Sequence, residues 1–205
     1  MRKGHVLGIA SLSAITLFGG IAHAERYTID PSHSTVGFKI RHLAISSVPG
    51  HFGDFSGALQ FDPQAVEKST VEATIVTKSI DTANKKRDDH LRGADFFDEP
   101  QNPTITFKST KVEPVSDGVF KATGDLTMHG VTRPVTLDVE YTGGATDPWG
   151  NKRVGFSAIT SLSRKDFGIT WNKALDAGGF VLGDEVKVSL EIEGVQESGE
   201  AKKAG

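Results

Sequence analysis

The chain has 205 residues, of which 37% are hydrophobic and 24% are charged, and its formal net charge is −3. This length suits one domain, and the composition is that of a globular protein rather than a collagen, a coiled coil or a disordered chain. The sequence contains no cysteine, which excludes disulfide bonds, thiolate metal sites and cysteine nucleophiles.

The first 24 residues have the layout of a secretory signal peptide. Arg2 and Lys3 precede a mostly apolar run over residues 6–21, and Ala22-His23-Ala24 matches a small-x-small cleavage site. The run is short for a membrane-spanning helix, which needs about 20 apolar residues. We therefore expect cleavage of this segment and a mature chain that begins at Glu25. Removing the segment leaves 21 basic against 26 acidic residues, a net charge of about −5 that would repel nucleic acid.

From residue 25 onward, apolar and polar residues alternate with a period of two, the pattern of strands that have one buried face. The alternation recurs about eight times, and loop signals such as Asp62-Pro63, His129-Gly130 and Asp147-Pro148 separate the runs. Short links favour antiparallel neighbours, and closing the sheet into a barrel would remove its exposed edges. We predict an all-β fold, an eight-stranded antiparallel β-barrel, with a bulged sandwich as the alternative.

A polar stretch from Asp81 to Arg92 interrupts the strand pattern and predicts a short helix at one end of the barrel, with Asp81 or Thr82 as its N-cap. The spacing of Asp88 and Arg92 predicts an i,i+4 ion pair. The rings of Phe96 and Phe97 would either pin the helix across a barrel mouth as a lid or plug the core beside a solvated connector. Residues 196–205 are expected to form a flexible tail.

The predicted strands carry most of the phenylalanines on their apolar faces. A barrel of eight strands is either just filled by side chains or holds one small ligand. The rings would therefore either pack into a dry core or form the wall of a tunnel for an elongated apolar molecule such as a lipid chain. Under the second interpretation, the residues predicted to line the pocket are Phe38, Ile40, Phe55, Leu59, Ile75, Phe107, Phe120, Leu137 and Phe156.

Sequence motifs for catalysis are absent. There is no HExxH, GxSxG, GxGxxG or Walker pattern, and the neighbouring residues Ser32, His33 and Ser34 would point to opposite faces of a strand. We therefore expect no metal, no cofactor and no catalytic residue. One enzymatic alternative places His42, Asp54, Arg92 and His129 together at the barrel mouth for acid–base chemistry on an apolar substrate. A third interpretation is a stress or adhesion protein that uses only its outer surface.

Four blocks of the sequence, residues 30–57, 79–98, 124–137 and 155–172, together with the late GDEVKVSLEIE at 183–193, resemble the YceI-like, polyisoprenoid-binding family. The resemblance extends from Tyr27 to Val195. It implies a lipocalin-like, extended antiparallel barrel with a helix beside it, exported to the periplasm. It also implies a pocket for isoprenoids or other long apolar molecules, and no established reaction.

Residues and resemblance together predict a signal peptide over 1–24, a YceI-like lipid-binding barrel over 25–195 and a tail over 196–205. The barrel would sequester or transport a polyisoprenoid, a quinone-like molecule or another long-chain lipid. A homodimer formed through barrel edges is left open. The residues expected near the ligand's polar head group at the mouth are His42, Arg92, Asp95, His129 and Arg133.

Overall fold

The computed structural model describes residues 24–176 and 178–197, so the predicted signal peptide, except Ala24, lies outside the described residues. The described chain forms eleven strands and one α-helix, joined by turns and short 3-10 helices. The strands are β1 (Glu25–Ile29), β2 (Thr35–His42), β3 (Ser46–Phe52), β4 (Phe55–Phe61), β5 (Thr70–Val76), β6 (Ile80–Asp81), β7 (Thr104–Ser116), β8 (Val119–Met128), β9 (Val131–Thr146), β10 (Lys152–Ser163) and β11 (Leu182–Gln196). The helix is α1 (Lys85–Arg92).

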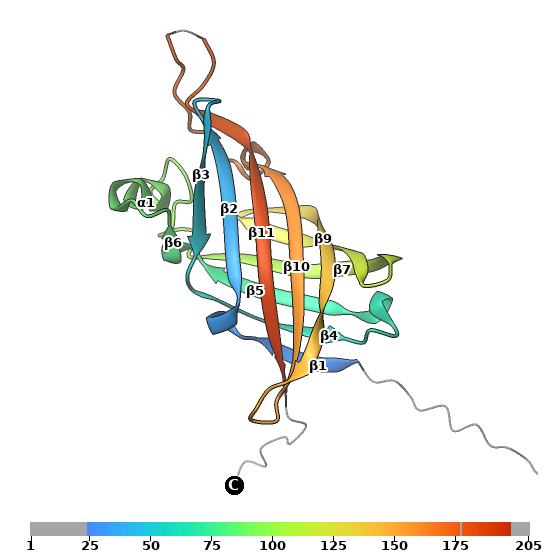
Figure 1. Ribbon diagram of the computed structural model, residues 1–205. Helices are drawn as coiled ribbons and strands as arrows, with labels where there is room; N and C mark the ends of the chain where they lie inside the picture. Colours follow the sequence, from blue (N-terminus) through green and yellow to red (C-terminus); the bar gives the residue numbers. More distant parts are fainter. Residues whose placement is uncertain (1–23, 177, 198–205) are drawn as a thin grey trace, which may run out of the picture.

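The strands form a closed antiparallel barrel (Figure 1). Eight strands follow one another around it in the order β1-β4-β5-β7-β8-β9-β10-β11, and pairing of β1 with β11 closes the ring. The predicted eight-stranded antiparallel barrel is confirmed. Among the described residues, no helix is both long enough and apolar enough to cross a membrane.

The three additional strands arise because three long strands of the barrel are each broken into two segments. Here each such long strand is called a ribbon, and the ribbons are β1 with β2, β3 with β4, and β5 with β6. β1 and β2 pair in turn with the same edge of β11, since Tyr27 lies opposite Gln196 and Phe38 lies opposite Val188. β4 pairs with β1, and β3 pairs with β2, in the same antiparallel sense. Short breaks, such as the 3-10 helix Pro31–His33, divide each ribbon in two. Counted in this way, the three broken ribbons and the five unbroken strands β7 to β11 give the eight strands that the sequence predicted.

The turn between β8 and β9 shows how local sequence sets the register of the barrel. Only His129 and Gly130 separate the two strands, and both have positive φ, 51° and 71°. This is the backbone that a two-residue hairpin with the twist of its strands requires, and glycine adopts it without steric cost. The turn fixes Met128 opposite Val131 and Leu126 opposite Arg133.

The N-cap of helix α1 lies two or three residues later than predicted. Asn84 is its N-cap, because the Asn84 side chain accepts a hydrogen bond from the Arg87 backbone N–H, whereas Asp81 belongs to β6. The predicted pair of Asp88 and Arg92 is also wrong. Asp88 is buried and accepts hydrogen bonds from the backbone and hydroxyl of Thr82, so Arg92 pairs instead with the exposed Asp89, 3.1 Å away.

Helix α1 lies beside β3 and β6, on the outside of the barrel (Figure 1). Arg92 fastens it there by donating hydrogen bonds to the carbonyl oxygens of Lys78 and Ile80. The two rings after the helix add apolar contacts: Phe96 is buried with its ring 5.2 Å from that of Trp171, and Phe97 meets Phe52 edge to face at 5.9 Å. The two rings therefore anchor the segment after the helix to the barrel wall. This favours the predicted role of a connector over that of a lid across the barrel mouth.

The predicted tail begins two residues too early. Gln196 pairs with Tyr27 in the β1–β11 ladder, and the Glu197 backbone N–H donates to the carbonyl oxygen of Arg26. Glu197 also accepts hydrogen bonds from the side chains of Arg26 and Thr28. Its polar side chain suggested a tail, but it is held by the strand that closes the barrel. The remainder of the predicted tail, residues 198–205, lies outside the described residues.

Candidate functional site

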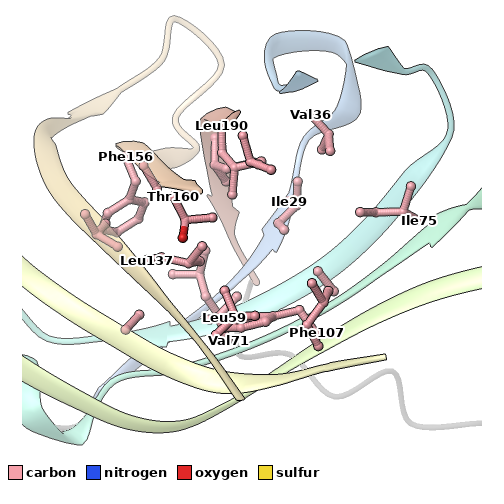
Figure 2. A pocket seen from close by; sticks show the side chains of 18 of the residues that line it. Ile29, Val36, Leu59, Val71, Ile75, Phe107, Leu137, Phe156, Thr160 and Leu190 are labelled. Carbon is pink, nitrogen blue, oxygen red and sulfur yellow. The ribbon is translucent and has the colours of Figure 1, made fainter. Parts of the chain in front are cut away.

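The barrel encloses an apolar cavity of about 220 Å³. Every strand except β6 contributes to its wall, and the labelled side chains of Figure 2 converge on one space from opposite sides of the barrel. The side chains that line it are aliphatic or aromatic apart from those of Gln60, Ser69, Thr70 and Thr160. The alternation of the strands explains this composition, because every second residue of a barrel strand points inward.

Eight of the nine residues predicted to line a pocket lie in this wall: Phe38, Phe55, Leu59, Ile75, Phe107, Phe120, Leu137 and Phe156. The exception is Ile40. It has the same strand parity as Phe38, but it pairs with Val48 and Val186, one step nearer the end of β2 and beyond the cavity. Parity predicts the face of a strand, whereas the length of the cavity along that strand depends on the whole barrel.

Other lining residues were missing from the predicted set although they share its pattern. Ala158, Thr160 and Leu162 alternate with Phe156 along β10, and all four line the cavity. Thr160 was missed because its polar side chain weakens the apolar signal. Its hydroxyl finds a partner by donating a hydrogen bond to the Thr136 carbonyl oxygen at 2.9 Å.

Two phenylalanine rings of the wall lie over glycines on the neighbouring strand. A Cβ atom at Gly50 would lie 2.3 Å from Cζ of Phe38, and one at Gly124 would lie 2.6 Å from Cζ of Phe107. Carbon atoms in contact rest about 3.5–4.0 Å apart, so any side chain at either glycine would push the ring away. The glycines thus let these rings lie flat against the wall, which leaves space along the barrel axis.

A second group of rings fills part of the interior. Phe61 packs against both Tyr141 and Phe156 with centroids 4.9 Å apart, and Phe120 stacks on Phe61 at 6.3 Å. Offset and edge-to-face contacts of this kind add to the apolar area that the rings bury. The interior therefore combines the two predicted alternatives: these rings interlock, and the remaining part of the barrel is open.

The polar residues predicted for a barrel mouth are not gathered in one place. Arg92 binds the carbonyl oxygens beside β6, and Asp95 pairs with His90, 2.8 Å away. His129 donates from Nδ1 to the Phe167 carbonyl oxygen, and Arg133 donates from Nε to the Asp166 carbonyl oxygen. Within the described chain, none of these four residues lines the cavity.

The remaining mouth residue, His42, ends β2 opposite Ser46 and Leu182 and also lies outside the cavity wall. In the described part of the chain, no hydrogen bond joins the side chains of His42, Asp54, Arg92 and His129. The enzymatic alternative requires these four groups to act on one substrate. Arg92 and His129 instead bind backbone carbonyls in different segments, an arrangement that holds loops in place.

One cluster of potential metal ligands joins the β1–β2 corner to β11. Ligand atoms of Asp30, His33 and Glu193 lie within 4.8 Å of one another. Arg153 already supplies a positive charge there, because its Nη1 bonds both Asp30 and Glu193, while its Nε bonds Asp147 in the β9–β10 turn. One hydrogen bond from His33 and one from Arg153 lower the pKa of Asp30 to about 2. The cluster therefore works as an ionic clamp between strand ends.

A buried arginine holds the segment that follows β10. Arg164 is 3% exposed and donates hydrogen bonds to the carbonyl oxygens of Gly183, Ile169 and Trp171. Burial lowers the pKa of its guanidinium, and the nearby carboxylate of Asp184 opposes that shift. Because charged hydrogen bonds in a buried site are strong, this one side chain fixes the path of residues 168–171 beside the barrel.

The YceI-like domain family matches the chain over residues 27–194. A UPF0312 protein of Vibrio cholerae is 38% identical over 198 residues, which cover 96% of this chain and all of that protein. The crystal structure of the Campylobacter jejuni YceI protein is 35% identical, with a TM-score of 0.68 and coverage of 82% of this chain and 96% of that one. A polyisoprenoid binding domain from Saccharophagus degradans, implicated in plant cell wall breakdown, is similar in fold, with a TM-score of 0.61, 15% identity and coverage of 83% and 98%.

Proposed function

Because this chain belongs to the YceI-like family, we propose that it is a periplasmic binding protein that holds a long apolar molecule in its barrel. The observation that carries the proposal is the cavity of about 220 Å³ with an almost wholly apolar wall. The proposed ligand class is polyisoprenoid, quinone-like or other long-chain lipid. The Saccharophagus domain of similar fold, described as polyisoprenoid binding, supports this choice.

The energetics of burial favour a chain-like ligand. Removing apolar surface from water contributes about 25 cal/mol per Å², so burial of roughly 300–400 Å² yields about 8–10 kcal/mol. That amount is comparable to the cost of losing translational and rotational freedom on binding, about 4–15 kcal/mol. A short apolar ligand therefore gains little net affinity, and a longer chain gains more.

The cavity is smaller than the pockets of roughly 300–1,000 Å³ that usually enclose drug-sized ligands. A long polyisoprenoid in this conformation of the protein would therefore be enclosed only in part. The protein would sequester or carry the apolar chain, with the polar end group of the ligand outside the apolar wall. This agrees with a carrier role, in which a ligand must be released as well as bound.

The experiment that tests the proposal is isothermal titration calorimetry of the purified chain with all-trans-farnesol, together with mass spectrometry of organic extracts from protein purified out of the periplasm. We expect saturable binding with a negative heat-capacity change, because apolar surface is buried. An empty protein that also binds no isoprenoid in the titration would contradict the proposal.

Two neighbouring positions on β10 provide a matched pair of variants. Ala158 lines the cavity, whereas the side chain of Ile159 lies on the outer face and is 58% exposed. Ala158→Phe should fill the cavity and abolish binding of farnesol, and Ile159→Phe, which adds a ring on the other face, should bind as the wild type does. Equal binding by both variants would place the ligand elsewhere.

The periplasmic location is tested separately. Expression of the full-length chain in a Gram-negative host, followed by osmotic-shock fractionation and N-terminal sequencing, should recover a protein that starts at Glu25. Retention of the uncleaved chain in the cytoplasm would overturn the location and leave the binding proposal to the titration.

A further inference from the structure

The wall of the barrel is interrupted between β9 and β10. The ladder between these strands runs from Lys152 opposite Thr146 to Ile159 opposite Asp138, and it ends there. Beyond that point residues 131–137 of β9 pair only with β8, and residues 160–163 of β10 pair only with β11, within the described chain. Closed barrels normally leave no free strand edges, so two facing edges inside one barrel are unusual.

We call this interruption the β9–β10 window. On one side it is bounded by the hydrogen bond from the Thr160 hydroxyl to the Thr136 carbonyl oxygen, next to the end of the ladder. Its opposite side is the 3-10 helix Arg164–Phe167, which is tied to the β9 side by hydrogen bonds from Arg133 and His129 to the carbonyl oxygens of Asp166 and Phe167. These bonds tie the helix to the β9 side of the gap.

A hollow on the outer surface lies in this window and shares residues with the inner cavity. Val135, Thr160 and Leu162 line both the outer hollow and the cavity. The other residues of the hollow are mostly polar and include Arg133, Ser161, Ser163 and Asp166. A single layer of side chains therefore separates the apolar interior from a polar outer surface.

We propose that the β9–β10 window is the passage through which the apolar chain of a ligand enters the barrel, with its polar end group held at Arg133. This rests on the proposed lipid-binding function. The observation that carries it is that Val135, Thr160 and Leu162 line both spaces where, within the described chain, the ladder between β9 and β10 has ended. A cavity too small for a long chain also needs such a passage, because the enclosed part must remain continuous with the part outside.

Arg133 suits the polar end of such a ligand. It shares the strand parity of Val135 and Leu137, which line the cavity, but it lies at the rim and is exposed. Its guanidinium donates from Nε to a backbone carbonyl, and it forms no ion pair in the described chain. The remaining N–H groups can donate to an accepting or anionic end group such as a carbonyl or a phosphate.

The test uses the absence of cysteine from the sequence. Thr136→Cys introduces one thiol at the window, and Glu140→Cys introduces one on the same face of the same strand, where β9 and β10 are still paired. Each variant is labelled with a bulky polyethylene glycol maleimide, and the rates of farnesol uptake and release are measured by stopped-flow. We expect the label at position 136 to slow both rates by about tenfold or more, and the label at 140 to leave them unchanged.

The outcomes separate the two proposals. If unlabelled Thr136→Cys and the wild type bind no farnesol, the proposed function fails, and the passage fails with it. If farnesol binds and the label at position 136 leaves both rates unchanged, the passage is refuted while the function stands. A third label, on Lys86→Cys of α1, that alone slows uptake would place the passage beside the helix and also refute the window.

The end-group assignment has its own comparison. Arg133→Gln should weaken binding of farnesyl phosphate about tenfold relative to farnesol, because the charged hydrogen bond is lost while the chain contacts are kept. An equal effect on both ligands would show that Arg133 acts only by supporting the window, and it would overturn the assignment of the end group.

Discussion

Replacing Gly50 with alanine tests whether the flat position of Phe38 sets the capacity of the cavity. The added Cβ would lie 2.3 Å from Cζ of Phe38, whereas carbon atoms rest about 3.5–4.0 Å apart, so the ring must move by about 1.2 Å or more. The wall lies behind the ring, and the movement is therefore into the cavity. Excluding about two methylene-sized groups of a bound chain, at about 0.8 kcal/mol each, predicts roughly 10- to 20-fold weaker binding.

The assay is calorimetric titration with farnesol, alongside thermal unfolding to verify that the variant is folded. Gly53→Ala is the matched control, because its Cβ would meet nothing nearer than the Ser79 carbonyl oxygen at 3.9 Å. Adding Phe38→Leu to Gly50→Ala removes the ring atoms that clash and should restore binding. Folded Gly50→Ala protein that binds farnesol as tightly as the wild type would refute the reasoning.

Three further predictions concern stability and cavity size. Hydrogen bonds from His33 and Arg153 hold the pKa of Asp30 at about 2, below its ordinary 3.8, so this carboxylate stabilises the fold above about pH 4 and the contribution is lost as the pH falls toward 2. Urea unfolding of Asp30→Asn should show a smaller loss of stability over that window, and an unchanged pH slope would contradict the clamp. Arg164→Met should lower the free energy of unfolding by about 3 kcal/mol, since three carbonyl oxygens, one of them buried and two partly buried, lose a donor at about 1 kcal/mol each. A loss below about 1 kcal/mol would be inconsistent with that role. Phe156→Ala should cost about 3–5 kcal/mol in chemical denaturation and enlarge the cavity, so that the variant binds bulkier apolar ligands than the wild type; unchanged ligand preference would argue against binding beside this ring.

Strand parity predicted much of the cavity wall, because a barrel strand places every second residue inside wherever it runs. Phe38 and Phe156, on strands far apart in the sequence, were both assigned to the interior on this basis, and both line the cavity. Ile40 shows the limit of the method. Its face follows from its parity, but its distance from the cavity follows from the pairing of β2 with β3 and β11.

Polar residues were harder to place, because a charged side chain has many potential partners. Arg92 was predicted to pair with Asp88, but Asp88 is buried against Thr82, and Arg92 pairs with Asp89 instead. The other N–H groups of Arg92 donate to the carbonyl oxygens of Lys78 and Ile80. His129 was assigned to a barrel mouth, and it binds a carbonyl oxygen 38 residues away in the chain. The sequence pattern does not predict these hydrogen bonds from side chains to distant carbonyl oxygens, because each bond depends on where two separate segments meet in the fold.

Local chemistry thus determined the strands, the hairpin at His129-Gly130 and the apolar inner face, because each depends on residues close together in the chain. The tertiary structure alone decided how much space remains inside, since that depends on how Phe38 rests against Gly50 and how Phe61 packs against Phe156. It also decided where the wall is interrupted. Within the described chain, residues 131–137 pair with β8 but not with β10, and the helix Arg164–Phe167 lies beside this gap, tied to β9 by Arg133.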